Sequence, residues 1–186
     1  IGIAGGFVRG RNGIDFQWKA QKVDRFGTDT PLNLENDATM QVFTADGHYC
    51  PKVQGTNCMF RKSVLREMGG FDENFAFYLD ETDICCRASQ QGWATAIIPT
   101  AEVQHGFEAS DRRTADRVPK SLFVEGQSKA YFCKKHASGF DCQHALNAFQ
   151  AEQHRRLIRL MVAGYVMPAD VKNLLISLDE GLMAGQ

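Results

Sequence analysis

The sequence lacks an excess of charge of either sign. Its 186 residues carry 21 Lys and Arg against 22 Asp and Glu, which gives a formal net charge of -1 at pH 7. A protein that coats nucleic acid needs a marked basic excess and a disordered acidic tail needs the opposite, so both classes are excluded. Hydrophobic residues make up 44% of the chain, enough for a domain of this length to bury its own core. We therefore expect a soluble globular protein with no nucleic-acid partner.

Cysteine pairs and long apolar runs are also missing. None of the six cysteines forms a Cys-x-x-Cys pair, and a chain of this length needs no disulfide framework. The N-terminal segment 1–6 has no basic flank and is too short for a secretory signal. The most apolar late stretch, residues 157–167, is interrupted by Arg159 and is shorter than the roughly 20 residues that span a membrane. These features predict reduced thiols and a cytoplasmic location.

The order of predicted strands and helices is that of an α/β protein. The stretch Thr28–Thr39 is rich in Asp, Asn and Thr and contains a proline, which predicts a loop. The alternation of apolar residues and the glycines that end helices and turns locate the other elements before residue 110. The expected strands lie at residues 1–9, 16–18, 93–98 and 102–105, and the expected helices at 63–68 and 80–92.

The last third of the sequence has a helical pattern throughout. A helix is expected at residues 121–136, and Gly139 separates it from a longer one. Pro168 suits the first turn of a last helix, whose apolar residues recur at helical spacing. These apolar residues are Val171, Leu174, Leu175, Leu178 and Leu182. We expect the apolar stripes of the last two helices to pack on the α/β body or a partner helix, with peripheral membrane contact as the alternative.

Three carboxylates, Asp80, Glu81 and Asp83, fall in the first turn of the helix that opens at residue 80. Asp80 suits the N-cap position, and acids in a first turn are stabilised by the helix dipole by about 0.3–1 kcal/mol each. Alternatively, one of these acids projects into a cleft as a general base, with a pKa raised by its neighbours. Spacing alone leaves both alternatives open.

A set of short motifs in a fixed order resembles the C-terminal half of a family-2 glycosyltransferase domain, which has the GT-A (Rossmann-like) fold of nucleotide-diphospho-sugar transferases. The resemblance covers residues 40–136 closely, residues 1–38 loosely and residues 137–186 not at all. The motifs that carry it are Gly55–Arg61, Leu65, Gly69–Glu73, Tyr78–Cys86, Arg87, Gly92, Pro99 and Val103–His105.

The resemblance implies an inverting sugar transfer, in which an acid at the start of this helix deprotonates an acceptor hydroxyl. The family's Glu-Asp pair falls on Asp80-Glu81, so that Glu81 occupies the position of the base. The proton acceptor is Glu81 or Asp80. Asp83 matches the acid that follows the pair, with a structural or acceptor-orienting role. The implied partners are a nucleotide-diphospho-sugar donor and a glycan or lipid-linked acceptor.

The resemblance also implies metal and acceptor positions. His105 matches a histidine that ligates a divalent Mg or Mn ion, which would neutralise the departing diphosphate; a hydrogen-bonded histidine at a strand end is the alternative. Gly55, Thr56 and Asn57 fall where the family lines its acceptor side, although a plain tight turn explains the glycine equally well. Arg112 and Arg113 lie in a polar stretch and are candidates to contact the donor diphosphate or a lipid-linked acceptor; a solvated loop with neighbouring acids as partners is the alternative.

One motif of the family is missing. The Asp-x-Asp motif that holds metal and nucleotide does not occur before residue 40. We therefore expect a partial domain that lacks its N-terminal nucleotide-binding half and is inactive alone, with residues 1–136 as the acceptor-side half and 137–186 as a helical extension. The parent protein is expected to be a non-processive bacterial enzyme of cell-surface polysaccharide synthesis. Its metal is expected to need the missing half.

Two other functions remain open from the sequence. The first is a non-catalytic carbohydrate-binding or scaffolding module that keeps only the acceptor half of the fold. The second is a zinc-stabilised interaction domain, suggested by the two Cys/His pairs Cys133/His136 and Cys142/His144. The second pair is separated by a single residue, which is closer than the usual spacing of zinc ligands.

Overall fold

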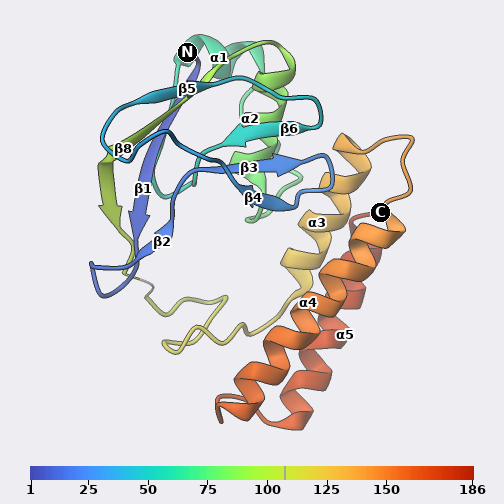
Figure 1. Cartoon of the computed structure of the whole chain (residues 1–186). Helices are drawn as coiled ribbons and strands as arrows, with labels where there is room; N and C mark the ends of the chain where they lie inside the picture. The colour runs from blue at the N-terminus through green and yellow to red at the C-terminus, as the bar shows by residue number, and fades with distance from the viewer. Residues whose placement is uncertain (107) are drawn as a thin grey trace. The chain divides into compact units, whose positions relative to one another are not determined.

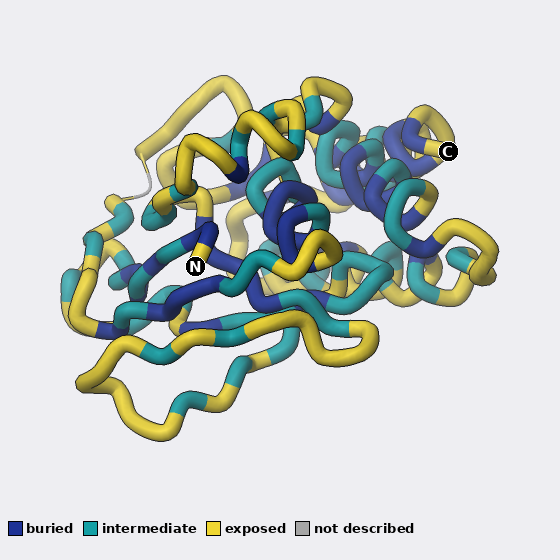
Figure 2. Tube along the Cα trace, turned by 90° about the horizontal axis from the view of Figure 1, so that it is seen from above, coloured by how far each residue is buried: buried dark blue, intermediate teal, exposed yellow. Residues whose placement is uncertain are grey.

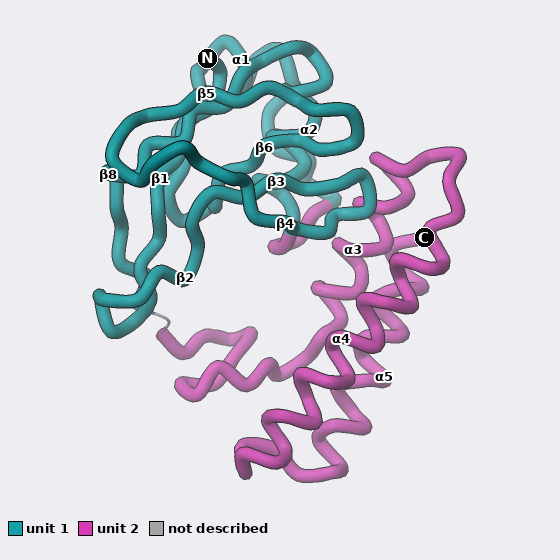
Figure 3. The backbone as a smooth tube through the Cα atoms, viewed as in Figure 1, with its two compact units in different colours: residues 1–74, 79–106 teal, residues 75–78, 107–186 magenta. Residues whose placement is uncertain are grey.

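The computed structural model describes residues 1–106 and 108–186. The chain divides into two compact units (Figure 3), one of Ile1–Asn74 with Leu79–Gly106 and the other of Phe75–Tyr78 with Phe107–Gln186. The boundary predicted at residue 136 does not coincide with this division, because the helix that ends there belongs to the second unit. As a boundary of the family domain it stays a prediction. The expected mixture of sheets and helices is confirmed.

The main sheet of the first unit is built around two long parallel strands (Figure 1), β1 (Ile3–Arg9) and β8 (Thr95–Gln104). The strand order is β2-β1-β8-β5, where β2 is Phe16–Trp18 and β5 is Gln41–Phe43. A further strand, β7 (Cys58–Phe60), pairs with the first residues of β1. All pairings except that of β1 with β8 are antiparallel.

A small antiparallel sheet follows the order β4-β3-β6. Its strands are β3 (Gln21–Asp24), β4 (Asp29–Pro31) and β6 (Tyr49–Lys52). The expectation of a loop from Thr28 to Thr39 was wrong for β4. The polar composition misled because β4 is a three-residue strand, too short to show any alternation of apolar residues.

The two strands expected at residues 93–98 and 102–105 form one continuous strand, β8. Pro99 lies inside it, where the expectation placed an end. The β1–β8 register shifts between Gly6 and Val8, so the ladder is interrupted beside the proline and its missing N–H costs no regular pairing. Gly6 is required there, because a Cβ at this position would lie 1.7 Å from the carbonyl oxygen of Ala101.

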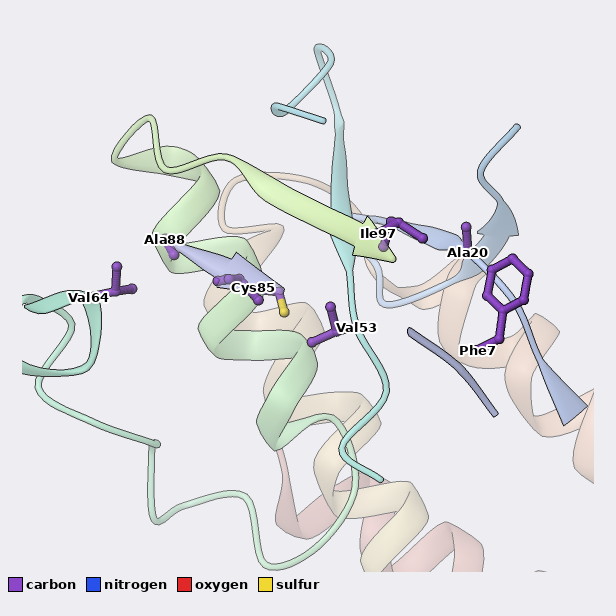
Figure 4. Close-up of a cluster of buried hydrophobic side chains, with 8 residues drawn as sticks. Phe7, Ala20, Val53, Val64, Cys85, Ala88 and Ile97 are labelled. Atoms are coloured by element: carbon purple, nitrogen blue, oxygen red, sulfur yellow. The ribbon is translucent and has the colours of Figure 1, made fainter. Parts of the chain in front are cut away.

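Two helices complete the first unit, α1 (Lys62–Glu67) and α2 (Asp80–Gln90). Buried side chains of α2 pack with residues of β1, β8 and α1 to form the core (Figure 4). Phe7, Ile97, Val64, Cys85 and Ala88 are labelled there and belong to one cluster of buried residues. The core therefore fixes α2, and with it the acidic first turn of that helix, against β6 and the main sheet.

The second unit contains α3 (Phe123–His136), α4 (Gln143–Val162) and α5 (Pro168–Ala184), close to the expected ranges. Pro168 occupies the first turn of α5, and Leu174 and Leu178 of its stripe are buried. Gly181 lets α3 approach, since a Cβ there would lie 2.0 Å from the carbonyl oxygen of Phe123. Figure 2 shows buried stretches in strands and helices and mostly exposed loops.

Candidate active site

Helix α2 begins at Asp80, as expected, but Asp80 is not its N-cap. The N-cap is Leu79, which has left-handed backbone angles (φ 66°, ψ 8°) and makes no side-chain capping bond. Asp80 is the first helical residue, and Glu81 and Asp83 share its turn. Because no side chain caps the helix, the carboxylates of Asp80 and Glu81 are available to interact with the helix dipole or with other groups.

Glu81 is largely enclosed, with 17% of its side chain exposed. Burial raises the pKa of Glu81, the ammonium of Lys52 lowers it, and the adjacent Asp80 raises it again. The hydroxyl of Thr82 donates to Oε1 of Glu81 at 3.2 Å. A carboxylate whose pKa is raised toward neutrality and which keeps some access to solvent has the properties of a general base.

A buried lysine lies beside this carboxylate. Only 4% of the Lys52 side chain is exposed, and its Nζ lies 3.9 Å from Oε1 of Glu81. The same Nζ donates to Oδ1 and Oδ2 of Asp29 at 3.1 and 3.0 Å. Sequence reasoning missed both Lys52 and Asp29. The available signal was a lysine within the stretch Pro51–Gln54, whose other residues are apolar or amide.

Two thiols complete the surroundings of Glu81. Burial, reinforced by the charges of Glu81 and Asp80, raises the pKa of Cys58. Burial likewise raises the pKa of Cys85 to about 12. Both thiols therefore stay neutral near pH 7 and add no charge to the site. The charged groups around Glu81 within the first unit are Asp80, Lys52 and, behind the lysine, Asp29.

Asp83 has different surroundings from Glu81. It is fully buried and forms an ion pair with Arg87, one turn later on α2, with Nε and Oδ2 2.7 Å apart. Arg87 also donates to the carbonyl oxygens of Met68 and Gly70, at 2.6 and 2.8 Å. This network ties α2 to the end of α1. Of the two roles left open for Asp83, the geometry favours the structural one.

The three residues expected on the acceptor side lie in one tight turn from Gln54 to Asn57, closed by a backbone bond of 2.8 Å. Gly55 and Thr56 are exposed, and a Cβ on Gly55 would lie 3.7 Å from Cγ of Glu81. The turn therefore runs directly beside the carboxylate. The side chain of Asn57 points elsewhere: its amide donates to the carbonyl oxygens of Phe7 and Ala101, at 3.0 and 2.7 Å. Asn57 braces the interrupted part of the β1–β8 ladder.

His105 follows β8 and is held by the strands beside it. Its Nδ1 lies 3.3 Å from Oε1 of Gln17, and its ring stacks on Trp18 with centroids 5.7 Å apart. Its backbone N–H donates to the backbone carbonyl oxygen of Arg9. These contacts match the alternative of a hydrogen-bonded histidine at a strand end.

Metal ligands do not cluster in the part of the chain that the structure describes. Among residues 1–106 and 108–186, no group of three or more His, Cys, Asp or Glu side chains is placed to hold an ion. The pairs Cys133/His136 and Cys142/His144 form no such group either. His105 alone therefore makes no metal site in these residues, and the expected Mg or Mn ion stays a prediction that depends on ligands from elsewhere.

The two arginines expected at the donor diphosphate belong to the second unit. The guanidinium of Arg112 lies over the ring of Phe77, with Cζ 4.2 Å from the centroid. Arg113 donates from Nε to the carbonyl oxygen of Glu108 at 3.1 Å. Both side chains thus have contacts within their own unit, and their role at a diphosphate stays a prediction.

Comparison with known families decides the relationship. The family model for glycosyl transferase family group 2 matches residues 25–179 of this chain. The chain belongs to glycosyl transferase family group 2. The match extends beyond residue 136 to 179, so the expectation that the resemblance excludes the helical extension was wrong. The motifs quoted above are local to residues 55–105, which is why the helical part carried no signal.

Two curated relatives resemble a shorter stretch of this family-2 chain. Both carry the name N-acetylglucosaminyl-diphospho-decaprenol L-rhamnosyltransferase, from Mycobacterium tuberculosis strains CDC 1551 / Oshkosh and ATCC 25618 / H37Rv. Each is 34% identical over 53 residues, which is 28% of this chain and 17% of the relative. The matched part thus spans less than a fifth of the length of these relatives. Within the described residues, no helix of this family member is both long and apolar enough to cross a membrane.

Proposed function

We propose that this chain supplies the catalytic base of a glycosyltransferase. The enzyme moves one sugar from a nucleotide-diphospho-sugar to a glycan or lipid-linked acceptor, with inversion and without processive polymerisation. Membership of family group 2 supports sugar transfer, and the relatives' name contains a diphospho-decaprenol, which supports a lipid-linked acceptor. A cytoplasmic enzyme of cell-surface glycan synthesis that touches the inner face of the membrane is consistent with both.

The proposed step is a single displacement. Glu81 takes the proton of an acceptor hydroxyl, the oxygen forms a bond to the anomeric carbon, and the bond from that carbon to the diphosphate oxygen breaks. The nucleoside diphosphate leaves with the electron pair, and attack from the opposite face inverts the anomeric configuration. Base assistance of this kind typically contributes 10²- to 10⁴-fold to the rate.

The observation that carries this proposal is the enclosure of Glu81 beside an exposed turn. Its side chain is largely buried, its pKa is raised, and the neighbouring Gly55 has no side chain to cover it. Asp83 is committed to Arg87, whereas Glu81 lies beside Lys52 and the open turn at Gly55. Glu81 is therefore the acid of the three that best suits proton abstraction.

The fate of the anomeric configuration tests this proposal. The full-length protein that contains this chain is incubated with nucleotide-diphospho-sugars and polyprenyl-diphosphate acceptors, and the product is examined by proton NMR. An inverted anomeric centre is the expected result. A retained configuration would exclude the single displacement. Binding of acceptor without turnover of any donor would favour the non-catalytic carbohydrate-binding module.

A further inference from the structure

A lysine buried as deeply as Lys52 needs compensation. Moving an ammonium out of water is costly unless it is paired and hydrogen-bonded, so a lysine that is 4% exposed is held in place by its partners. The partners come from two different elements. Asp29 lies on β4 and Glu81 lies on α2, whereas Lys52 ends β6.

The small sheet explains why Asp29 and Lys52 meet. Both β4 and β6 pair with β3, where Asp29 lies opposite Val23 and Lys52 lies opposite Gln21. Gln21 and Val23 are two residues apart, so their partners project from the same face of the sheet. Helix α2 packs against β6, which brings Glu81 to the same place.

The ammonium of Lys52 lies closer to Asp29 than to Glu81. Nζ of Lys52 is within hydrogen-bond range of both Asp29 oxygens, at 3.0 and 3.1 Å, but 3.9 Å from the nearer Glu81 oxygen. Glu81 therefore receives the field of the positive charge without a hydrogen bond from it. A direct hydrogen bond would stabilise the charged carboxylate further and weaken it as a base, whereas the loss of the positive charge would raise the pKa of the buried carboxylate.

We propose that Lys52 is a positioning residue that keeps Glu81 ionised, and that Asp29 holds the lysine back from bonding to it. The proposal rests on the proposed function, in which Glu81 is the base. The other groups that face Glu81 within its unit are Asp80, whose charge opposes the effect of Lys52, the neutral thiols of Cys58 and Cys85, and the Thr82 hydroxyl.

Removing the charge of Lys52 and removing the charge of Asp29 are predicted to shift the acidic limb of the kcat–pH profile in opposite directions. In Lys52→Met the limb moves to higher pH by about one unit, because the ionised carboxylate loses its positive neighbour, and turnover recovers above the new limb. Lys52→Arg keeps the charge and holds the limb near its wild-type position. In Asp29→Asn the limb moves to lower pH and the plateau of kcat falls, because the freed ammonium moves onto Glu81.

The experiment measures these profiles on the full-length protein that contains this chain, with Lys62→Met of α1 as the control for loss of an exposed lysine. If Lys52→Met does not fold, Asp29→Asn combined with Lys52→Met removes both charges, and the same upward shift is expected. Three results would overturn the proposal. The acidic limb stays in place in Lys52→Met, or it shifts equally in Lys52→Arg, or it shifts upward in Asp29→Asn. Full turnover in Glu81→Gln would instead refute the proposed base, so the two failures are distinguishable.

Discussion

Asp83 and Arg87 face each other one turn apart on α2, with the carboxylate fully buried and 2.7 Å from the guanidinium. The arginine continues to two carbonyl oxygens at the end of α1, those of Met68 and Gly70. The pair thus holds in place the helix whose first turn carries Glu81. An acid that supports the site from within the core has a different mutational signature from an acid that reacts.

We predict that Asp83→Asn lowers the free energy of unfolding by about 3 kcal/mol, because the partly buried Arg87 loses the carboxylate that pairs with its charge. Asp80→Asn, in the same turn but not buried, serves as the matched control and costs less than about 1 kcal/mol. Urea denaturation of both variants measures the difference. Equal losses in the two variants would speak against a structural role for Asp83.

Asn57→Ala is expected to lower the free energy of unfolding by about 1–3 kcal/mol. The substitution removes the amide that bonds to the carbonyl oxygens of Phe7 and Ala101, where the ladder cannot supply a partner. Thr56→Ala, one residue earlier and exposed, is expected to change stability by less than about 0.5 kcal/mol. A variant Asn57→Ala of unchanged stability but weakened acceptor binding would restore the acceptor-side assignment.

Gly6→Ala is expected to be among the most damaging substitutions in the first unit. The new methyl group would lie 1.7 Å from the carbonyl oxygen of Ala101, so β1 and β8 would have to separate. We expect a loss of more than about 3 kcal/mol or no soluble protein at all. Gly106→Ala is the control, because a Cβ there meets nothing within 4 Å. A thermal melt of Gly6→Ala that matches the control would contradict the close approach.

The sequence predicted those elements whose signals are local. Pro168 and the stripe from Val171 to Leu182 located α5, and the acidic run after Leu79 located the start of α2. Each depends on neighbours within a few residues, where helix periodicity and capping preferences act.

What the sequence did not predict depends on contacts between distant segments. Nothing near Lys52 shows that Asp29, 23 residues away, will share its ammonium. Pro99 was expected to end a strand because the shift of register on β1 that tolerates it is set by Gly6 and Asn57. The N-cap was assigned to Asp80 by residue preference, whereas Leu79 takes that position in a left-handed conformation.

Glu81→Gln is expected to stabilise the protein at neutral pH. Because burial raises the pKa of Glu81 above the ordinary value of 4.5, the folded state favours the protonated carboxyl. The folded protein therefore loses stability as pH rises through and above that value, and a neutral glutamine avoids this loss. Urea denaturation at pH 7 and near pH 4 tests the expectation. The stabilisation should be present at pH 7 and shrink at pH 4; a destabilisation at pH 7 would contradict it.

The transfer rate of Glu81→Gln in the full-length protein tests the central claim most directly, with donor affinity measured on the same sample and Asp80→Asn as the comparison. If Glu81 is the base, kcat falls by about 10²- to 10⁴-fold while donor binding stays as in the wild type, and Asp80→Asn loses much less. Transfer by Glu81→Gln at the wild-type rate would contradict the account.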